Sequence, residues 1–230
     1  MKPAARPKRT WLTNILFGIL VLILAFYLGC ACMILALRWL NPPATAVQIQ
    51  REVEALVAKK PYHHHRLYVP LSRIAPDLQY AVIAAEDGRF YIHHGFDWLE
   101  LQKVMKTDLA KRSLGRGAST ITQQLVKNLF LGTGRSVIRK GIESTLVPLV
   151  ELFLTKSRIL ELYLNEIEWG PGIFGAEAAT EFWYHTPATE LTRDQAARLA
   201  AIIPNPLKRA PSREDEYSAE IQDRMQKMGW

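Results

Sequence analysis

An unbroken apolar run near the start of the chain is its clearest pattern. The 27 residues from Trp11 to Leu37 carry no charged side chain, and Trp11 and Trp39 bound the run. About 20 helical residues cross a hydrocarbon core of about 30 Å, and tryptophan is frequent at both membrane interfaces. A cleaved signal peptide has a shorter apolar core followed by a small-residue cleavage site. The pattern therefore predicts a transmembrane anchor over 11–40.

The polar and apolar positions that follow the anchor repeat with a helical period. Asn41-Pro42-Pro43 ends the first helix because proline cannot donate a backbone hydrogen bond. A linker over 41–65 is expected to hold a helix at about 46–58 and then a short extended piece with three adjacent histidines. Those histidines point to alternate sides and cannot all bind one metal. Further helices are predicted at about 97–111, 120–130, 136–154, 158–168, 172–184, 193–203 and 215–228.

Helix-start signals support this series. Thr120-x-x-Gln123 and Thr192-x-x-Gln195 have the form of capping boxes, and Ser157 is suited to an N-cap before Arg158. The alternation typical of strands is almost absent. We therefore expect residues 66–230 to form one mainly α domain behind the single N-terminal transmembrane helix.

The distribution of charge is most informative at the N-terminus, where it predicts the orientation of the chain in the membrane. The tail over 1–10 is basic, which by the positive-inside rule places it in the cytoplasm and the rest of the chain outside. Removing the five basic residues up to Arg38 from the total of 29 leaves 24 basic against 22 acidic residues in the exported part. That balance excludes the basic surface of a nucleic-acid binder. Cys30 and Cys32 both lie in the apolar run, so the exported domain needs no disulfide.

A dense string of small polar side chains follows a glycine-rich turn. The string Ser-Thr-Ile-Thr-Gln-Gln at 119–124 is followed by a lysine. Hydroxyls and amides compete for backbone hydrogen bonds and make a poor helix face for a core, but they can line a site for a polyhydroxylated or phosphorylated ligand. The candidate substrate-binding residues here are Ser119, Thr120, Gln123, Gln124 and Lys127.

A carboxylate ends the apolar stretch at 82–85. Partial desolvation of Glu86 would raise its pKa toward the range of a general base. The alternative is a helix-terminal Glu86-Asp87 pair in solvent.

A third cluster combines cations with one acid. Arg139 and Glu143 stand one helical turn apart, Lys140 shares their face, and Arg135 precedes them. The cluster is either a surface ion-pair ladder or a cradle for phosphate. Pro148 is expected to kink the helix that carries it.

Together these strings resemble the signature motifs of the peptidoglycan glycosyltransferases, a lysozyme-like family. The first is Glu86-Asp87-x-x-Phe90-x-x-His93-x-Gly95, followed by the polar string and by Arg139-Lys140-x-x-Glu143. Two later strings, at 156–165 and 194–200, also match, so the resemblance covers about 69–211. The chain has no Ser-x-x-Lys, the mark of the penicillin-binding transpeptidase, and resembles the monofunctional type.

The resemblance implies a reaction and a location. The family polymerises lipid II with inversion and releases undecaprenyl diphosphate. Glu86 is then the catalytic base, and Lys127, Arg135, Arg139 and Lys140 bind the pyrophosphate with a divalent cation, Mg²⁺ or Mn²⁺, and no organic cofactor. Glu143, the second catalytic candidate, orients these cations or helps to hold the metal. The expected partners are lipid II, the polyprenyl-linked glycan chain, the membrane and other cell-wall synthesis proteins, with the domain in the periplasm of an inner membrane.

The sequence is compatible with two rival functions. A lysozyme-like hydrolase would share the fold and one catalytic glutamate, but it has no pyrophosphate to stabilise. An inactive scaffold for cell-wall enzymes would not need Glu86 or Glu143. The segment 99–114, with Leu101, Val104, Met105, Leu109 and Leu114 between lysines, is either a membrane-dipping flap or an amphipathic core helix.

Overall fold

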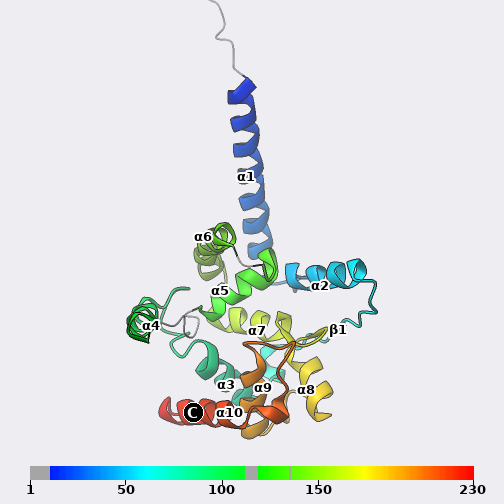
Figure 1. The fold of residues 1–230 in the computed structure, drawn as a ribbon, viewed down its shortest axis with the longest axis vertical. Coiled ribbons are helices and arrows are strands. Elements are labelled where there is room, and N and C mark those ends of the chain that lie inside the picture. The colour runs from blue at the N-terminus through cyan, green and yellow to red at the C-terminus, as the bar shows by residue number, and fades with distance from the viewer. Residues whose placement is uncertain (1–10, 112–118, 135) are drawn as a thin grey trace, which may run out of the picture.

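A computed structural model describes residues 11–111, 119–134 and 136–230. Helix α1 (Trp11–Ala36) stands away from the rest of the molecule, and its length and composition fit a single-pass membrane anchor (Figure 1). Its last turns enter the folded part, where Cys30, Ile34 and Leu37 are buried. The predicted apolar helix is confirmed. The finer boundaries between tail, anchor, linker and domain stay predictions.

The side chain of Arg158 fixes the end of α1 to the domain. Its guanidinium donates to the backbone oxygens of Leu37 at 2.8 Å and Leu40 at 2.7 Å, and to the side-chain oxygen of Asn41 at 2.9 Å. The carbonyls at a helix end have no partner within the helix, so a cation placed there satisfies them. The anchor is therefore joined to the domain at a defined position.

The described part of the domain is mainly α, as predicted, and its helices lie close to the expected ranges. They are α2 (Ala46–Val57), α3 (Pro76–Glu86), α4 (Trp98–Lys111), α5 (Ile121–Val126), α6 (Val137–Phe153), α7 (Lys156–Glu166), α8 (Ala176–Tyr184), α9 (Arg193–Ile202) and α10 (Asp215–Lys227). A π-helical turn, η2 (Lys127–Leu131), continues α5. Helix α6 runs through Pro148 without ending.

Capping explains most helix starts. The boxes at Thr120 and Thr192 are both present, and a third one, which pairs Thr45 with Gln48, opens α2. The predicted cap at Ser157 is wrong. Thr155 accepts from the backbone N–H of Arg158 at 3.2 Å, because an N-cap side chain reaches the third helical residue, and this places the start of α7 at Lys156.

A small sheet replaces the predicted start of one helix. Strand β3 (Ile173–Phe174) lies between β1 (His65–Arg66), to which it is parallel, and β2 (Glu168–Gly170), to which it is antiparallel. Gly172 has a φ of +75°, and a Cβ there would lie 2.2 Å from the backbone oxygen of His63. Only glycine allows that approach, so α8 begins after this turn and not at 172.

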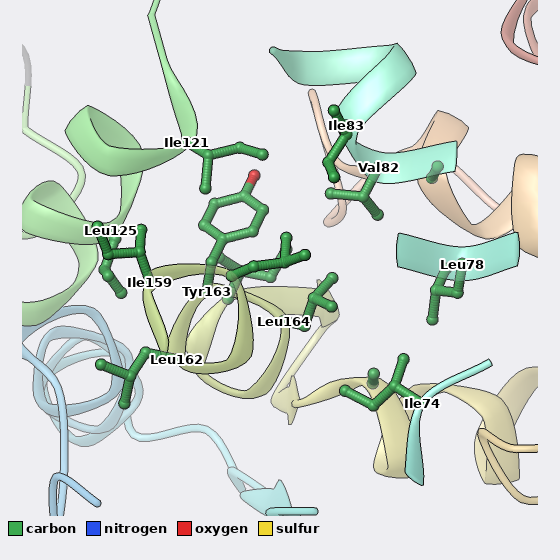
Figure 2. Packing of buried hydrophobic residues seen from close by; sticks show 14 of the residues in the cluster. Ile74, Leu78, Val82, Ile83, Ile121, Leu125, Ile159, Leu162, Tyr163 and Leu164 are labelled. Carbon is green, nitrogen blue, oxygen red and sulfur yellow. The ribbon is translucent and has the colours of Figure 1, made fainter. Parts of the chain in front are cut away.

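The core is built around α7. Its side chains Ile159, Leu162, Tyr163 and Leu164 are fully buried. In Figure 2, residues of α5 lie on one side of α7 and residues of α3 on the other. This packing brings the last turn of α3 and the polar face of α5 together at one cleft.

Candidate active site

A cleft runs from the end of α3 to the first turns of α6. It consists of two hollows of about 600 Å³ each, which share the polar residues Ser119, Gln124 and Lys127 and the apolar residues Ile203 and Pro204. The first hollow is also lined by Glu86, and the second by Arg139, Lys140 and Glu143. The structure thus places the candidate base and the candidate cations along one continuous surface.

The carboxylate of Glu86 is half-buried at the last residue of α3. The side-chain amide of Gln124 donates to its Oε2 at 2.6 Å, and the hydroxyl of Tyr163 donates to Oε1 of the same amide at 2.9 Å. Burial raises the pKa of Tyr163 well above its ordinary value, so its hydroxyl stays protonated and remains a donor. Tyr163 therefore holds the NH₂ of Gln124 toward Glu86. The raised pKa of Glu86 stays a prediction.

A buried hydrogen-bond network joins the first motif to the second. The backbone N–H of Gly95 donates to Nδ1 of His93 at 3.1 Å, which leaves the proton on Nε2, and Nε2 donates to Asp87 at 2.8 Å. The other oxygen of Asp87 accepts from the backbone of Ile121 at 2.9 Å, and the hydroxyl of Thr120 donates to the carbonyl of Gly95 at 2.7 Å. His93 is in this way a positioning residue for the loop.

The same network includes a group of three potential metal ligands. Ligand atoms of Asp87, His93 and Asp97 lie within 4.8 Å of one another. However, His93 presents N–H to Asp87, and Asp97 accepts from the backbone of Glu100 at 2.9 Å and from Arg89 at 3.4 Å. These groups are already paired, so the cluster fits an internal network and not a metal site.

The residues of the polar string at 119–124 have two different roles. Thr120 and Gln123 are buried and cap each other at the start of α5, with bonds of 2.9 and 3.2 Å between side chain and backbone. Ser119 and Gln124 are half-buried and line both hollows. The geometry therefore gives Ser119 and Gln124 the more direct access to a ligand, while substrate binding by Thr120 and Gln123 stays a prediction.

The cationic cluster is built around a buried carboxylate. One oxygen of Glu143 accepts from Arg139 at 3.0 Å, and the other is paired with the ammonium of Lys140, which also reaches Ser119 at 3.4 Å. Both oxygens are engaged, so Glu143 orients two cations toward the second hollow. Nε of Arg139 is buried with no hydrogen-bond partner among the described residues. The fourth predicted cation, Arg135, lies outside the described residues.

Lys127 is the cation that faces both hollows. Within the described ranges, its ammonium makes no hydrogen bond or ion pair, although the field of Glu143 acts on it. Burial is the main cause that lowers its pKa from the ordinary value. A half-buried cation that gains no ion pair from described residues is stabilised by an anionic ligand.

Two residues that shape the cleft were missed by sequence reasoning. Tyr163 holds Gln124 from the buried side, and Arg51 of α2 lines the second hollow, where its Nε donates to Glu168 at 2.9 Å. The signal for Tyr163 was a hydroxyl among the mostly apolar residues 159–164 of α7. No local pattern marked Arg51.

The fold and the cleft define a class of protein. A helical domain on an apolar anchor, with the half-buried carboxylate of Glu86 in the same cleft as a line of cations, is suited to transferring a glycosyl group from an anionic leaving group. Residues 52–228 match the family model described as Transglycosylase, and the chain belongs to this family. The predicted family is therefore confirmed.

Proteins with similar sequences match most of this chain. A protein of Pseudomonas putida strain W619 is 45% identical over 194 residues, which is 84% of this chain and 82% of the relative. A protein of Ectopseudomonas mendocina strain ymp is 44% identical over 215 residues, 92% of this chain and 88% of the relative. A protein of Pseudomonas syringae pv. syringae strain B728a is 41% identical over 222 residues, which is 95% of this chain and 94% of the relative. Each of the three is named biosynthetic peptidoglycan transglycosylase.

Proposed function

We propose that this chain is a membrane-anchored peptidoglycan glycosyltransferase that polymerises lipid II into glycan strands. One observation carries the proposal: Glu86 and the cations Lys127, Arg139 and Lys140 lie along the two connected hollows of one cleft. Membership of the transglycosylase family supports the same reaction.

The proposed step uses Glu86 as the base. The 4-hydroxyl of the acceptor sugar loses its proton to Glu86 while its oxygen forms a bond to the anomeric carbon of the donor. The bond from that carbon to the pyrophosphate oxygen breaks, and its electron pair leaves with the polyprenyl diphosphate. Attack opposite the leaving group inverts the anomeric centre.

The leaving group needs charge stabilisation more than a proton. Polyprenyl diphosphate leaves as a stable anion, and Lys127, Arg139 and Lys140 can neutralise the charge that develops on it. Arg139, which lines the second hollow, carries the planar guanidinium that suits phosphate. Glu143 holds Arg139 and Lys140 in place and has no free oxygen left to act as an acid.

A divalent cation is proposed only as a companion of the substrate. Both oxygens of Glu143 are paired, and the Asp87, His93 and Asp97 cluster is closed by its own hydrogen bonds, so the described residues offer no preformed site. Turnover measured with and without a chelator tests whether the reaction needs a divalent cation.

The proposed orientation puts the cleft outside the cytoplasm. The basic residues of the 1–10 tail favour a cytoplasmic N-terminus, which would place the domain in the periplasm beside its lipid-linked substrate. Protection of the domain from added protease in intact spheroplasts would contradict this orientation. Contacts with other cell-wall synthesis proteins stay a prediction.

The product of the purified full chain separates the proposal from a hydrolase. The chain in detergent is incubated with labelled lipid II, and in a parallel reaction with preformed glycan strands. We expect long strands from lipid II and no fragments from the strands. Fragments without polymer would favour the lysozyme-like hydrolase, and neither product would favour the inactive scaffold.

A further inference from the structure

Helix α2 packs on the domain through its more polar side. Gln48 is buried and donates to Glu166 at 3.2 Å, and Arg51 donates to Glu168 at 2.9 Å. Val47 is the one large apolar side chain of the helix that is buried there. A surface helix of a globular protein normally turns its apolar stripe inward, so this arrangement is inverted.

The apolar stripe of α2 points outward instead. Ile49, Val53, Leu56 and Val57 are 53%, 52%, 77% and 77% exposed. With 3.6 residues per turn, these four side chains fall within an arc of about 100°, opposite the side that carries Gln48 and Arg51. A contiguous apolar surface of this kind marks a site that something covers.

The position of α2 indicates what covers it. Residues 37–45 join it to the membrane helix, and Trp39 and Leu40 on that connection are exposed as well. In Figure 1, α2 runs crosswise to α1 at its lower end, with α7 on the side away from α1. The side of α2 that carries Gln48 binds Glu166 at the end of α7. The apolar arc therefore faces the side on which α1 extends, which is the side of the bilayer.

We propose that α2 is an interfacial helix that lies on the lipid surface, with Ile49, Val53, Leu56 and Val57 inserted at the boundary between headgroups and acyl chains. The apolar arc supplies the buried area for such binding. Lys59 and Lys60, exposed just after the helix, lie where anionic headgroups would attract them. The proposal does not depend on the enzymatic function.

This contact would fix the height of the cleft above the bilayer. Arg51, on the inner side of the same helix, lines the second hollow. Arg158 joins the end of α1 to the domain. A transmembrane helix and a surface helix on one rigid junction restrict the tilt of the domain, which a single span alone does not.

The test is a depth measurement on the full chain in vesicles of phosphatidylethanolamine and phosphatidylglycerol. In a Cys30→Ser/Cys32→Ser background, Val53→Cys or Leu56→Cys is labelled with an environment-sensitive fluorophore. The control is Phe182→Cys, because Phe182 is 53% exposed against 52% for Val53. The helix that carries it, α8, lies in the lower part of the molecule in Figure 1, away from α1. Circular dichroism establishes that each labelled chain is folded.

We expect the emission of the labels on α2 to shift to shorter wavelength. These labels should be quenched by lipids with a spin label near the headgroup and protected from aqueous iodide. The label at 182 should be quenched by iodide, with no shift in emission and no quenching by the lipids. Iodide quenching at 53 and 56 equal to that at 182 would overturn the proposal. Protection from both quenchers would mean that protein covers the arc, such as a second copy of the chain, and would overturn the assignment to lipid.

Discussion

The side-chain amide of Gln124 is hydrogen-bonded through both its nitrogen and its oxygen. Its amide donates to Glu86, while its oxygen accepts from Tyr163 on the central helix. The orientation of the proposed base therefore depends on a hydroxyl that is fully buried and lines neither hollow of the cleft. The same logic applies at His93, whose tautomer is set by the backbone of Gly95.

Removing the Tyr163 hydroxyl should slow catalysis without weakening substrate binding. Tyr163→Phe keeps the buried ring but leaves the oxygen of Gln124 without its donor, which costs about 1–3 kcal/mol of stability. We expect a lower kcat with little change in KM. Tyr184→Phe is the control, because its hydroxyl bonds to the backbone of Gln195 instead of to Gln124. Equal kinetic effects in both variants would reduce Tyr163 to a structural residue.

Lys127 gives the clearest charge prediction. Lys127→Met keeps the length of the side chain and removes the cation, and we expect a loss of about 10²–10³ in kcat, as for other groups that stabilise a leaving anion. Lys227→Met is the control, since Lys227 lines the first hollow but is paired with Asp223 at 2.6 Å. Similar turnover of the two variants would remove Lys127 from the mechanism.

The pH dependence of the same lysine has a definite sign. Burial lowers its pKa, so the folded state loses the proton at lower pH than the unfolded chain. Between the lowered and the ordinary pKa the unfolded state binds more protons, and the free energy of unfolding rises with pH. Turnover falls over the same range as the cation is lost. Lys127→Met should lack this stability gain, and an unchanged pH profile of unfolding would contradict the assignment.

At the scale of elements, periodicity predicted the helices but not the sheet. Strands of two or three residues carry no alternation, and the turn between β2 and β3 depends on the positive φ of Gly172. The pattern also predicted the helix at 46–58 but not which side of it faces the domain. That choice is made by Glu166 and Glu168, more than 100 residues later in the chain.

The candidate site was also predicted only in part from the sequence. Glu86 stands out in the sequence because it ends an apolar stretch, and Lys127 because it follows a dense string of small polar side chains. The cluster around Glu143 stands out because it places cations and one acid on the same helical face. Tyr163 and Arg51 did not, because only the packing of α7 brings Tyr163 to Gln124 and only the packing of α2 brings Arg51 to the cleft. The segment 99–114 stays open. Leu99 and Leu101 are exposed on α4, while the side chains of Met105, Leu109 and Leu114 lie outside the described residues.

A glycine controls the loop between the first two motifs. Gly95 has a φ of +86°, and a Cβ there would lie 2.4 Å from Cγ1 of Val147. Gly95→Ala should therefore destabilise the protein by more than the about 1–2 kcal/mol of left-handed strain alone. Gly141→Ala is the control, because that helical position is open and alanine there should stabilise by about 0.5–1 kcal/mol. Thermal unfolding measures both, and a neutral Gly95→Ala would mean that the loop does not need this conformation.

At the scale of the whole molecule, the anchor is part of the folded structure as well as a tether. Deleting residues 1–40 removes the buried side chains of Ile34 and Leu37 and the carbonyls that Arg158 binds. We expect a folded domain that unfolds at lower temperature. Its turnover should fall more with substrate in bilayers than with substrate in detergent, because the anchor raises the effective concentration at the membrane. Equal losses in both settings would mean that α1 shapes the cleft itself.

The central claim is that Glu86 removes the proton of the attacking hydroxyl, and one substitution tests it most directly. Glu86→Gln keeps the shape of the side chain but cannot accept a proton, and loss of a general base reduces the rate by about 10²–10⁴-fold. Glu100→Gln is the matched control, on the rim of the same hollow and paired with Lys103. We predict that Glu86→Gln still binds lipid II but forms no glycan strands, while Glu100→Gln polymerises normally. Normal polymerisation by Glu86→Gln, with an unchanged pH profile, would contradict the account.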